Sequence, residues 1–183
     1  MITVISGTNR PNSKTALVAL KLYEILALHS PNEVGYIDLA TLNIDFVNES
    51  MYSTEGQHPW ITELQDQLLI PSSLWIIVSP EYNGSYPGIL KLFIDAISVR
   101  KYNQVFKSKK LALVGLADGR AGNMRGMEHL TGLFHYLGVL VMPNKLPLSS
   151  FKTLLDEHGE INAPTVNLLE KFLEEVVAFK KMN

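Results

Sequence analysis

The segment "SPEYNGSYPGILKLFIDAIS", residues 79–98, has the pattern of a strand end, a tight turn and a helix. The segment begins at the last residue of an apolar run, residues 74–79, which has the pattern of a strand. Pro80 ends this strand because proline has no N–H group to donate. Asn83 and Gly84 are typical turn residues, and Gly88 begins a helical pattern that continues to residue 99. Because the run at 74–79 is apolar along its length, it predicts a strand buried on both faces of a parallel sheet.

The same alternation of apolar runs and helical patterns extends over the whole chain. Strands are expected at residues 2–6, 34–38, 74–79, 111–116 and 139–142. Helices are expected at residues 14–29, 60–70, 88–99, 124–137 and 164–179. Strands that alternate with helices in this way predict an α/β fold, a three-layer α/β/α sandwich. Right-handed crossovers then favour a five-stranded parallel sheet with the flavodoxin-like order 2-1-3-4-5.

The composition is that of a folded protein with a single domain, residues 1–183. A net charge of −2 offers no basic surface for nucleic acid. The absence of cysteine excludes disulfides and a cysteine nucleophile, and the histidines show no metal-ligand spacing, so we expect no metal site. No apolar run is long enough to span a bilayer, and the start "MITVIS" lacks a signal-peptide pattern. We therefore expect a cytoplasmic protein with no membrane or nucleic-acid partner.

In a sheet of this kind ligands bind beyond the carboxyl ends of the strands, which places the chemistry in loops 6–15, 79–87 and 117–123. The first loop, "SGTNRPNSKT", is rich in small polar residues before a helix. Thr8 and Ser13 offer hydroxyl groups, Arg10 can donate two hydrogen bonds to phosphate oxygens, and the first amides of the helix are free. The loop therefore suits a terminal phosphate that is held rather than transferred.

Two other interpretations of this loop remain open at the level of the sequence. A nucleotide-hydrolysing P-loop needs a glycine before its Lys-Ser/Thr pair, and here the spacing is one residue too long and Ser13 stands in that place. Asp118, at the end of the fourth strand, could imitate the Mg²⁺-binding acid of such an enzyme. The loop could also be a polar turn in which Ser13 only caps the following helix.

The second loop is the most specific stretch of the chain. Its backbone N–H and C=O groups should face the crevice, flanked by the rings of Tyr82 and Tyr86. A planar heterocycle with its own donors and acceptors would suit such a site. An ordinary strand–turn–helix connection would need neither the run of residues 80–84 nor a second proline at Pro87.

With these loops, the chain resembles the NAD(P)H-dependent FMN reductase family of flavodoxin-like proteins. The first family motif, G-S-x-R-x-x-S, is matched by Gly7, Thr8, Arg10 and Ser13. The second, P-E-Y-N-x-S-x-P-G, is matched by Pro80, Glu81, Tyr82, Asn83, Ser85, Pro87 and Gly88. The third, a glycine-rich loop, is matched by Gly119, Arg120, Ala121 and Gly122. The resemblance covers residues 2–142.

The resemblance implies a set of cofactor-binding residues. The FMN phosphate would be held by Thr8, Arg10, Ser13 and Thr15. The isoalloxazine ring would lie along Pro80, Glu81, Tyr82, Asn83 and Gly84, with its other side approached by Gly119, Arg120 and Gly122. Asn123 stands where the family often has a second glycine, which would put a side chain near the place of the nicotinamide ring.

The resemblance also implies an activity. NADPH or NADH would serve as a transient hydride donor, and electrons would pass to a small acceptor such as a flavin or a quinone in a ping-pong cycle. Hydride delivery needs no general base, so we expect no catalytic side chain. The alternative is a flavodoxin-like electron carrier that binds FMN without turning over NAD(P)H.

The helix at residues 88–99 is apolar on nearly all sides, with Ile89, Leu90, Leu92, Phe93, Ile94, Ala96 and Ile97. One stripe of this surface should cover the sheet, and the rest would be exposed in a monomer. The sequence therefore predicts a homodimer through this helix, with a tetramer as a further possibility.

Overall fold

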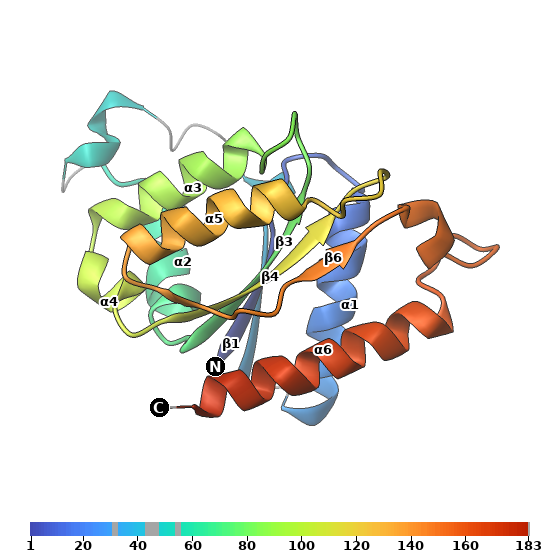
Figure 1. Ribbon diagram of the computed structural model, residues 1–183. Coiled ribbons are helices and arrows are strands. Elements are labelled where there is room, and N and C mark those ends of the chain that lie inside the picture. The colour runs from blue at the N-terminus through green and yellow to red at the C-terminus, as the bar shows by residue number, and fades with distance from the viewer. Residues whose placement is uncertain (31–32, 43–47, 54–55, 183) are drawn as a thin grey trace.

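The centre of the protein is a parallel sheet whose strands follow the order β2-β1-β3-β4-β5, with a short β6 paired to β4 (Figure 1). The computed structural model describes residues 1–30, 33–42, 48–53 and 56–182. Its strands are β1 (Ile2–Ser6), β2 (Val34–Asp38), β3 (Leu74–Pro80), β4 (Lys110–Leu116), β5 (Leu140–Val141) and β6 (Leu146–Leu148). The flavodoxin-like order predicted for the five strands is therefore confirmed.

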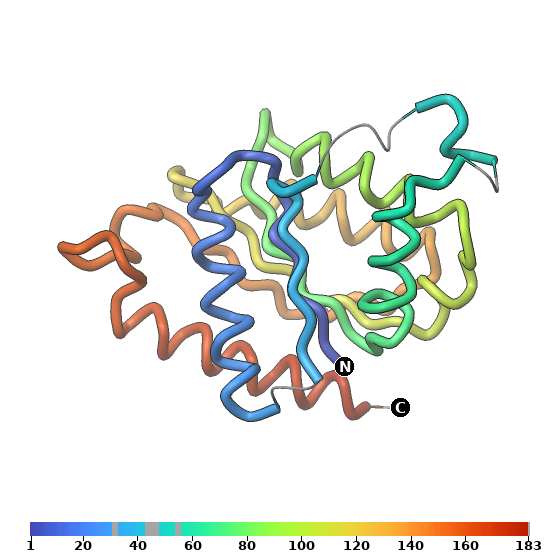
Figure 2. The backbone as a smooth tube through the Cα atoms, turned by 180° about the vertical axis from the view of Figure 1, so that it is seen from behind, coloured from blue at the N-terminus to red at the C-terminus, as the bar shows by residue number. Residues whose placement is uncertain are grey.

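Helices cover both faces of the sheet, which gives the three layers that the sequence predicts (Figures 1 and 2). One face packs against α1 (Lys14–His29) and α6 (Ala163–Lys181). The other packs against α2 (Pro59–Leu64), α3 (Gly88–Val99), α4 (Tyr102–Phe106) and α5 (Met124–Tyr136). No helix in the described parts of the chain combines the length and apolarity needed to cross a bilayer.

The residues of strand β3 are apolar along most of its length because both faces of the strand are buried. Trp75 and Ile77 belong to the core beneath α3 and α5, whereas Leu74, Ile76 and Val78 belong to the core beneath α1 and α6. Successive side chains of a strand point to opposite faces, so both sets are buried. Its side chains therefore point alternately into the two cores, and none of these five points into solvent.

The edge of the sheet beyond β4 differs from the prediction. Residues 110–111 of β4 pair with β5, and residues 114–116 pair with β6, so the two short strands follow one another along the same edge of β4. The expected strand at 139–142 is therefore only two residues long, and β6 is an addition. A three-residue strand with Pro147 at its centre has no periodicity that a sequence pattern could reveal.

The helix expected at 60–70 is divided. After α2 the chain widens into a π-helical turn, η5 (Gln65–Leu69), in which the amide of Ile70 donates to the carbonyl of Gln65 at 2.8 Å. Shorter helical turns are η2 (Leu39–Thr41), η4 (Glu49–Tyr52) and η6 (Phe151–Leu154).

The exposed apolar surface expected on α3 is largely absent. Its buried residues are Ile89, Leu90, Phe93, Ile94, Ala96 and Ile97. Leu92 alone among the apolar residues singled out on this helix is exposed, at 36%. Besides the sheet, α3 contacts α2, α4 and η4, and these neighbours cover the sides that the sequence analysis leaves open.

Candidate functional site

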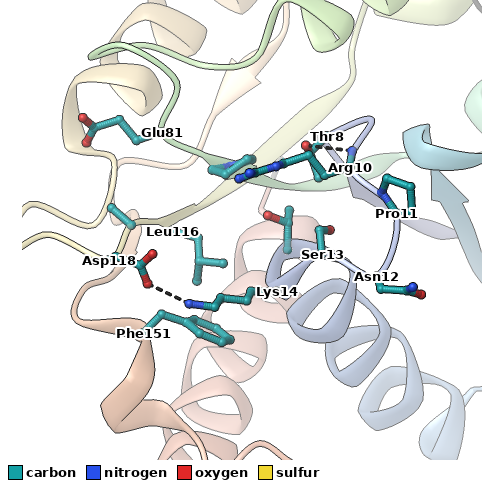
Figure 3. Close-up of a pocket in the computed structure, with 13 residues that line it drawn as sticks. Thr8, Arg10, Pro11, Asn12, Ser13, Lys14, Glu81, Leu116, Asp118 and Phe151 are labelled. Carbon is teal, nitrogen blue, oxygen red and sulfur yellow. Dashed lines mark hydrogen bonds and ion pairs between the residues drawn. The ribbon is translucent and has the colours of Figure 1, made fainter. Parts of the chain in front are cut away.

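A pocket of about 370 Å³ lies at the carboxyl ends of β1, β3 and β4, where a parallel sheet of this kind binds ligands (Figure 3). Its wall consists of Thr8, Arg10, Pro11, Asn12, Ser13, Lys14, Thr15, Pro80, Glu81, Leu116, Ala117, Asp118 and Phe151. A larger, mostly apolar hollow of about 800 Å³ between α1, β2 and α6 includes Ile2 and Val34, the first residues of their strands. It therefore lies at the opposite end of the sheet, away from the three loops.

The first loop passes close to β3 before it enters α1. The amide of Gly7 donates to the carbonyl of Val78 at 2.8 Å, and a Cβ atom on Gly7 would lie only 2.9 Å from that oxygen. Ser13 caps α1, because its Oγ accepts from the amide of Ala16 at 3.0 Å. The amides of Lys14 and Thr15 precede the first amide with an intrahelical acceptor, so they remain available to an anion.

Arg10 and Thr8 connect this loop to the second one. The buried Thr8 hydroxyl is hydrogen-bonded to the Tyr82 hydroxyl at 2.9 Å. The Arg10 guanidinium lies over the Tyr82 ring, 6.0 Å from its centroid. Among the described residues Arg10 forms no ion pair, so its charge is available to a ligand in the pocket.

Lys14 and Asp118 form an ion pair across the pocket, with Lys14 Nζ 2.9 Å from Asp118 Oδ1 (Figure 3). The hydrogen bond from Lys14 lowers the pKa of Asp118. The same ammonium lies 5.0 Å from the centroid of the Phe151 ring. The lysine and the acid on which the nucleotide-hydrolysis alternative depends are therefore paired with each other.

The second loop contains the turn that its sequence predicts. Asn83 and Gly84 have positive φ angles of 51° and 76°, as the central residues of a type I′ turn require. Backbone hydrogen bonds between Tyr82 and Ser85, of 2.8 and 3.0 Å, close this turn. The Ser85 hydroxyl reaches Nδ1 of His129 on α5 at 2.9 Å, which anchors the turn to that helix.

The third loop rests on the strand that the sequence analysis missed. Gly122 has a φ of 53°, and a Cβ atom there would lie 2.7 Å from the Cβ of Pro147 in β6. The carbonyl of Gly119 accepts from the amide of Ser150 at 3.1 Å. The segment that follows residue 142 therefore supports the third loop.

The Asn123 side chain points into the core and is not part of the pocket wall, so it adds no exposed group near the expected place of the nicotinamide. The residue is fully buried, and its Nδ2 donates to the carbonyls of Ser79 and Pro80, both at 2.9 Å. Its Oδ1 is buried without a hydrogen-bond partner. A Cβ atom on Gly126 would lie 2.2 Å from this Oδ1, so the glycine provides the space that the carboxamide occupies.

The pocket brings together part of the predicted set. Its wall includes Thr8, Arg10, Ser13, Thr15, Pro80 and Glu81 and leaves out Tyr82, Asn83, Gly84, Gly119, Arg120 and Gly122. It also includes Lys14, Asp118 and Phe151, which the family motifs do not indicate. Lys14 and Asp118 could have been found as charged residues at a helix start and a strand end. Phe151 carries no local signal, because only the fold brings it to this place.

The residues present fit a ligand that ends in a phosphate monoester, as FMN does. The pocket volume lies in the range of small-molecule sites. The guanidinium of Arg10, which forms no ion pair among the described residues, can donate to phosphate oxygens. The free amides of Lys14 and Thr15 can do the same. Pro80 and Glu81 begin the second loop on the same wall, so a ligand anchored at α1 can extend along that loop.

The chain is similar to known flavin- and quinone-reducing proteins in sequence and in structure. Residues 1–153 match the family described as NADPH-dependent FMN reductase. An NAD(P)H-dependent FMN reductase of Pseudomonas aeruginosa is 31% identical over 86% of this chain and 82% of that protein. A 2-hydroxy-1,4-benzoquinone reductase of a Burkholderia species is 26% identical over 97% of this chain and 94% of that protein. The flavoenzyme NAD(P)H:(acceptor) oxidoreductase FerB of Paracoccus denitrificans has the same fold, with a TM-score of 0.76 and 20% identity over 98% of this chain and 96% of that one.

The family match covers the first two loops, the third loop and β6, and so extends beyond the motifs that the sequence analysis used. FMN and NADPH, the cofactors in the family's description, are those that the motifs imply. The enzyme class that the resemblance implies is confirmed by the same match. The chain therefore belongs to the NADPH-dependent FMN reductase family and is a flavin-dependent oxidoreductase.

Proposed function

We propose that this enzyme holds FMN with the phosphate at the start of α1 and the ring system along the second loop, and that it reduces a quinone-type acceptor with electrons from NADPH or NADH. The observation that carries this proposal is the pocket itself. It joins Arg10, the free amides at the start of α1 and the beginning of the second loop at the carboxyl ends of three strands.

The first loop would bind the phosphate through several donors. Arg10 supplies a charged pair of N–H groups, and Thr8 and Thr15 supply hydroxyls from the pocket wall. Ser13 Oγ already accepts from Ala16, which leaves its own O–H free to donate to a phosphate oxygen. The backbone amides of Lys14 and Thr15 complete the set.

The second and third loops would bind the ring system from two sides. Residues 80–84 would present backbone groups to its polar edge, and Gly119, Arg120 and Gly122 would lie toward its other side. Bound FMN supplies the electron-accepting centre to which a nicotinamide delivers hydride. The protein's part is to orient and enclose the reactants, and we assign no side chain a role in proton transfer.

The acceptor class is inferred from relatives. The Burkholderia protein is named for a benzoquinone, and it aligns over almost the whole chain. A quinone is a planar ring that could occupy the place vacated by the nicotinamide. This supports a ping-pong cycle in which the two substrates use one position in turn.

A homodimer in the cytoplasm and a single domain, residues 1–183, are further parts of this proposal. Leu92 of α3 and Met124 of α5 are exposed at 36% and 41%, and the two helices lie side by side on one face of the sheet (Figure 1). These residues support a contact through α3 and α5.

Cytoplasmic location would give the enzyme access to NAD(P)H. Sedimentation of a monomer at working concentrations would contradict the dimer.

Anaerobic visible spectroscopy tests the proposed function. We expect the protein to perturb the FMN absorption band, NADPH or NADH to bleach it, and 1,4-benzoquinone to restore it. Arg10→Ala should weaken FMN binding roughly tenfold, because one charge-assisted pair of hydrogen bonds is lost. Riboflavin, which lacks the phosphate, should bind both proteins equally. Lys171→Ala removes a charge from an exposed position on α6 and serves as the control.

The other results would separate the alternatives. A bound flavin that stays oxidised with both nucleotides would indicate the electron carrier. A protein that perturbs neither FMN nor riboflavin would contradict the site as proposed. Bleaching of the flavin without reoxidation by the quinone would support FMN as cofactor and NAD(P)H as donor, and it would contradict a quinone as the acceptor.

A further inference from the structure

The Lys14–Asp118 ion pair joins two loops that are far apart in the sequence. Lys14 is the first residue of α1, and Asp118 lies just beyond the end of β4. Both side chains line the pocket, and the bond between them runs across it (Figure 3). A ligand phosphate at the start of α1 must therefore meet this pair.

The pair can open without disturbing the core. The Lys14 side chain is 45% exposed and that of Asp118 is 74% exposed. Exposed ion pairs contribute little to the stability of the fold, so replacing one partner of the pair by another anion costs little free energy. Phe151 is buried beneath the ammonium and keeps a favourable cation–π contact with it. This ring can hold the Lys14 ammonium at the pocket whichever anion it faces.

Opening the ion pair would change the number of cations in the pocket wall that can face a phosphate. The wall carries two cations, Arg10 and Lys14, and two carboxylates, Glu81 and Asp118. Figure 3 shows the Glu81 carboxylate pointing away from Lys14. While Lys14 is paired with Asp118, Arg10 is the only other cation of the wall that can face a phosphate, which carries between one and two negative charges at neutral pH.

We propose that Asp118 competes with the phosphate of FMN for Lys14. In the free protein Asp118 holds the Lys14 ammonium, and in the complex the ammonium turns to the phosphate. Asp118 thereby limits the affinity for the phosphorylated cofactor and leaves the affinity for riboflavin unchanged. This inference rests on the proposed function, because it assumes that the phosphate binds at the start of α1.

Flavin fluorescence titrations of the purified protein with FMN and with riboflavin test the competition. Asp118→Asn should bind FMN about two- to fivefold more tightly, the equivalent of one exposed ion pair. Lys14→Met should bind FMN roughly tenfold more weakly, because a charge-assisted hydrogen bond is lost. Neither variant should change the affinity for riboflavin. Glu174→Gln and Lys171→Ala, at exposed positions of α6, control for the change in net charge.

The double variant Lys14→Met/Asp118→Asn separates competition from direct repulsion. Competition predicts that Asp118→Asn tightens FMN binding less in the Lys14→Met background than in the wild type. An equal gain in both backgrounds would show that Asp118 only repels the phosphate. Weaker FMN binding by Asp118→Asn would mean that Asp118 orients Lys14 for the ligand. Either result, or unchanged FMN binding in all variants, would overturn the competition.

The same titrations distinguish this inference from the proposed function. A wild-type protein that binds FMN more tightly than riboflavin supports a phosphate site, whatever the variants do. A wild type that binds both flavins equally contradicts the phosphate site and the competition with it. Riboflavin affinity that changes in parallel with FMN affinity would indicate a general disturbance of the pocket and would also overturn the inference.

Discussion

Asn123 joins the end of β3 to the start of α5 with one side chain. Its carboxamide donates to two successive carbonyls, those of Ser79 and Pro80, at the point where the strand becomes the second loop. Its backbone has a φ of 59°, a left-handed conformation that asparagine tolerates better than most residues. The residue therefore fixes the direction in which the second loop leaves the sheet.

We predict that Asn123→Ala lowers the free energy of unfolding by about 1–3 kcal/mol, because the buried carbonyl of Ser79 and the partly buried carbonyl of Pro80 each lose a hydrogen bond. Asn123→Asp should cost more, because a carboxylate oxygen would face both carbonyls in a buried place. Urea unfolding measures both values, with Asn167→Ala on the exposed face of α6 as the control. Equal stability of Asn123→Ala and the wild type would contradict the role of this side chain.

The same residue shows where sequence patterns reach their limit. The phosphate-binding character of Thr8, Arg10 and Ser13 could be predicted, because a capped helix start with hydroxyls and an arginine is a local feature. The position of Asn123 could not. Whether that side chain points into the site or into the core depends on Gly126, one helical turn later, which leaves the space it fills.

At the scale of elements, the π-helical turn η5 fastens α2 to the end of α3. The buried Gln65 donates from Nε2 to the carbonyls of Ile97 and Arg100 at 2.8 and 2.9 Å. The next residue, Asp66, forms ion pairs with Arg100 and Lys101, both at 2.8 Å. Two adjacent side chains of η5 thus bind the last turn of α3 and the residues after it.

Hydrogen bonds from Arg100 and Lys101 lower the pKa of Asp66 from 3.8 to about 2. Because the pKa is lower in the folded state, the pairs stabilise the fold above pH 4, and this contribution is lost as the pH falls from about 4 to 2. We predict that Asp66→Asn unfolds with a smaller dependence on pH in that window. Thermal unfolding between pH 5 and 2 measures it, with Glu174→Gln as the control. Parallel curves for Asp66→Asn and the wild type would contradict this linkage.

Most elements could be predicted, and the exceptions share a cause. Long helices and buried strands repeat a pattern over many residues, so their positions follow from spacing alone. Strand β6 has three residues and η5 one turn, which is too short for a period to appear. The exposure of α3 was misjudged for a related reason, since a helix pattern indicates which sides are apolar but not which neighbours cover them.

At the scale of the molecule, α6 lies outside the matched family region but completes one of its two hydrophobic cores. The family match ends at residue 153, before α6 begins at Ala163. The core under α1 contains Leu169, Phe172, Leu173 and Val176 of α6. Lys110, at the start of β4, donates to the carbonyls of Phe179 and Lys180 and so holds the last turn of this helix.

A chain that ends at residue 153 should therefore fail to fold cooperatively. Removal of α6 would expose the part of this face that α1 does not cover. The lost burial of several leucine and phenylalanine side chains is comparable with the whole stability of an ordinary domain. Circular dichroism during heating, together with binding of a hydrophobic dye, measures this. A sharp transition in the truncated chain would contradict the prediction. Leu168→Ala, at a 41% exposed position of α6 in the full chain, should unfold nearly as the wild type does.

The divided edge beyond β4 has a consequence for self-association. A continuous edge strand offers a row of free N–H and C=O groups that another chain can extend, which is a common route to aggregation. Here that row is interrupted between β5 and β6, and Pro147 removes one donor from the second piece. Strand-by-strand growth of the sheet is therefore hindered on this side, which favours association through side chains over backbone pairing.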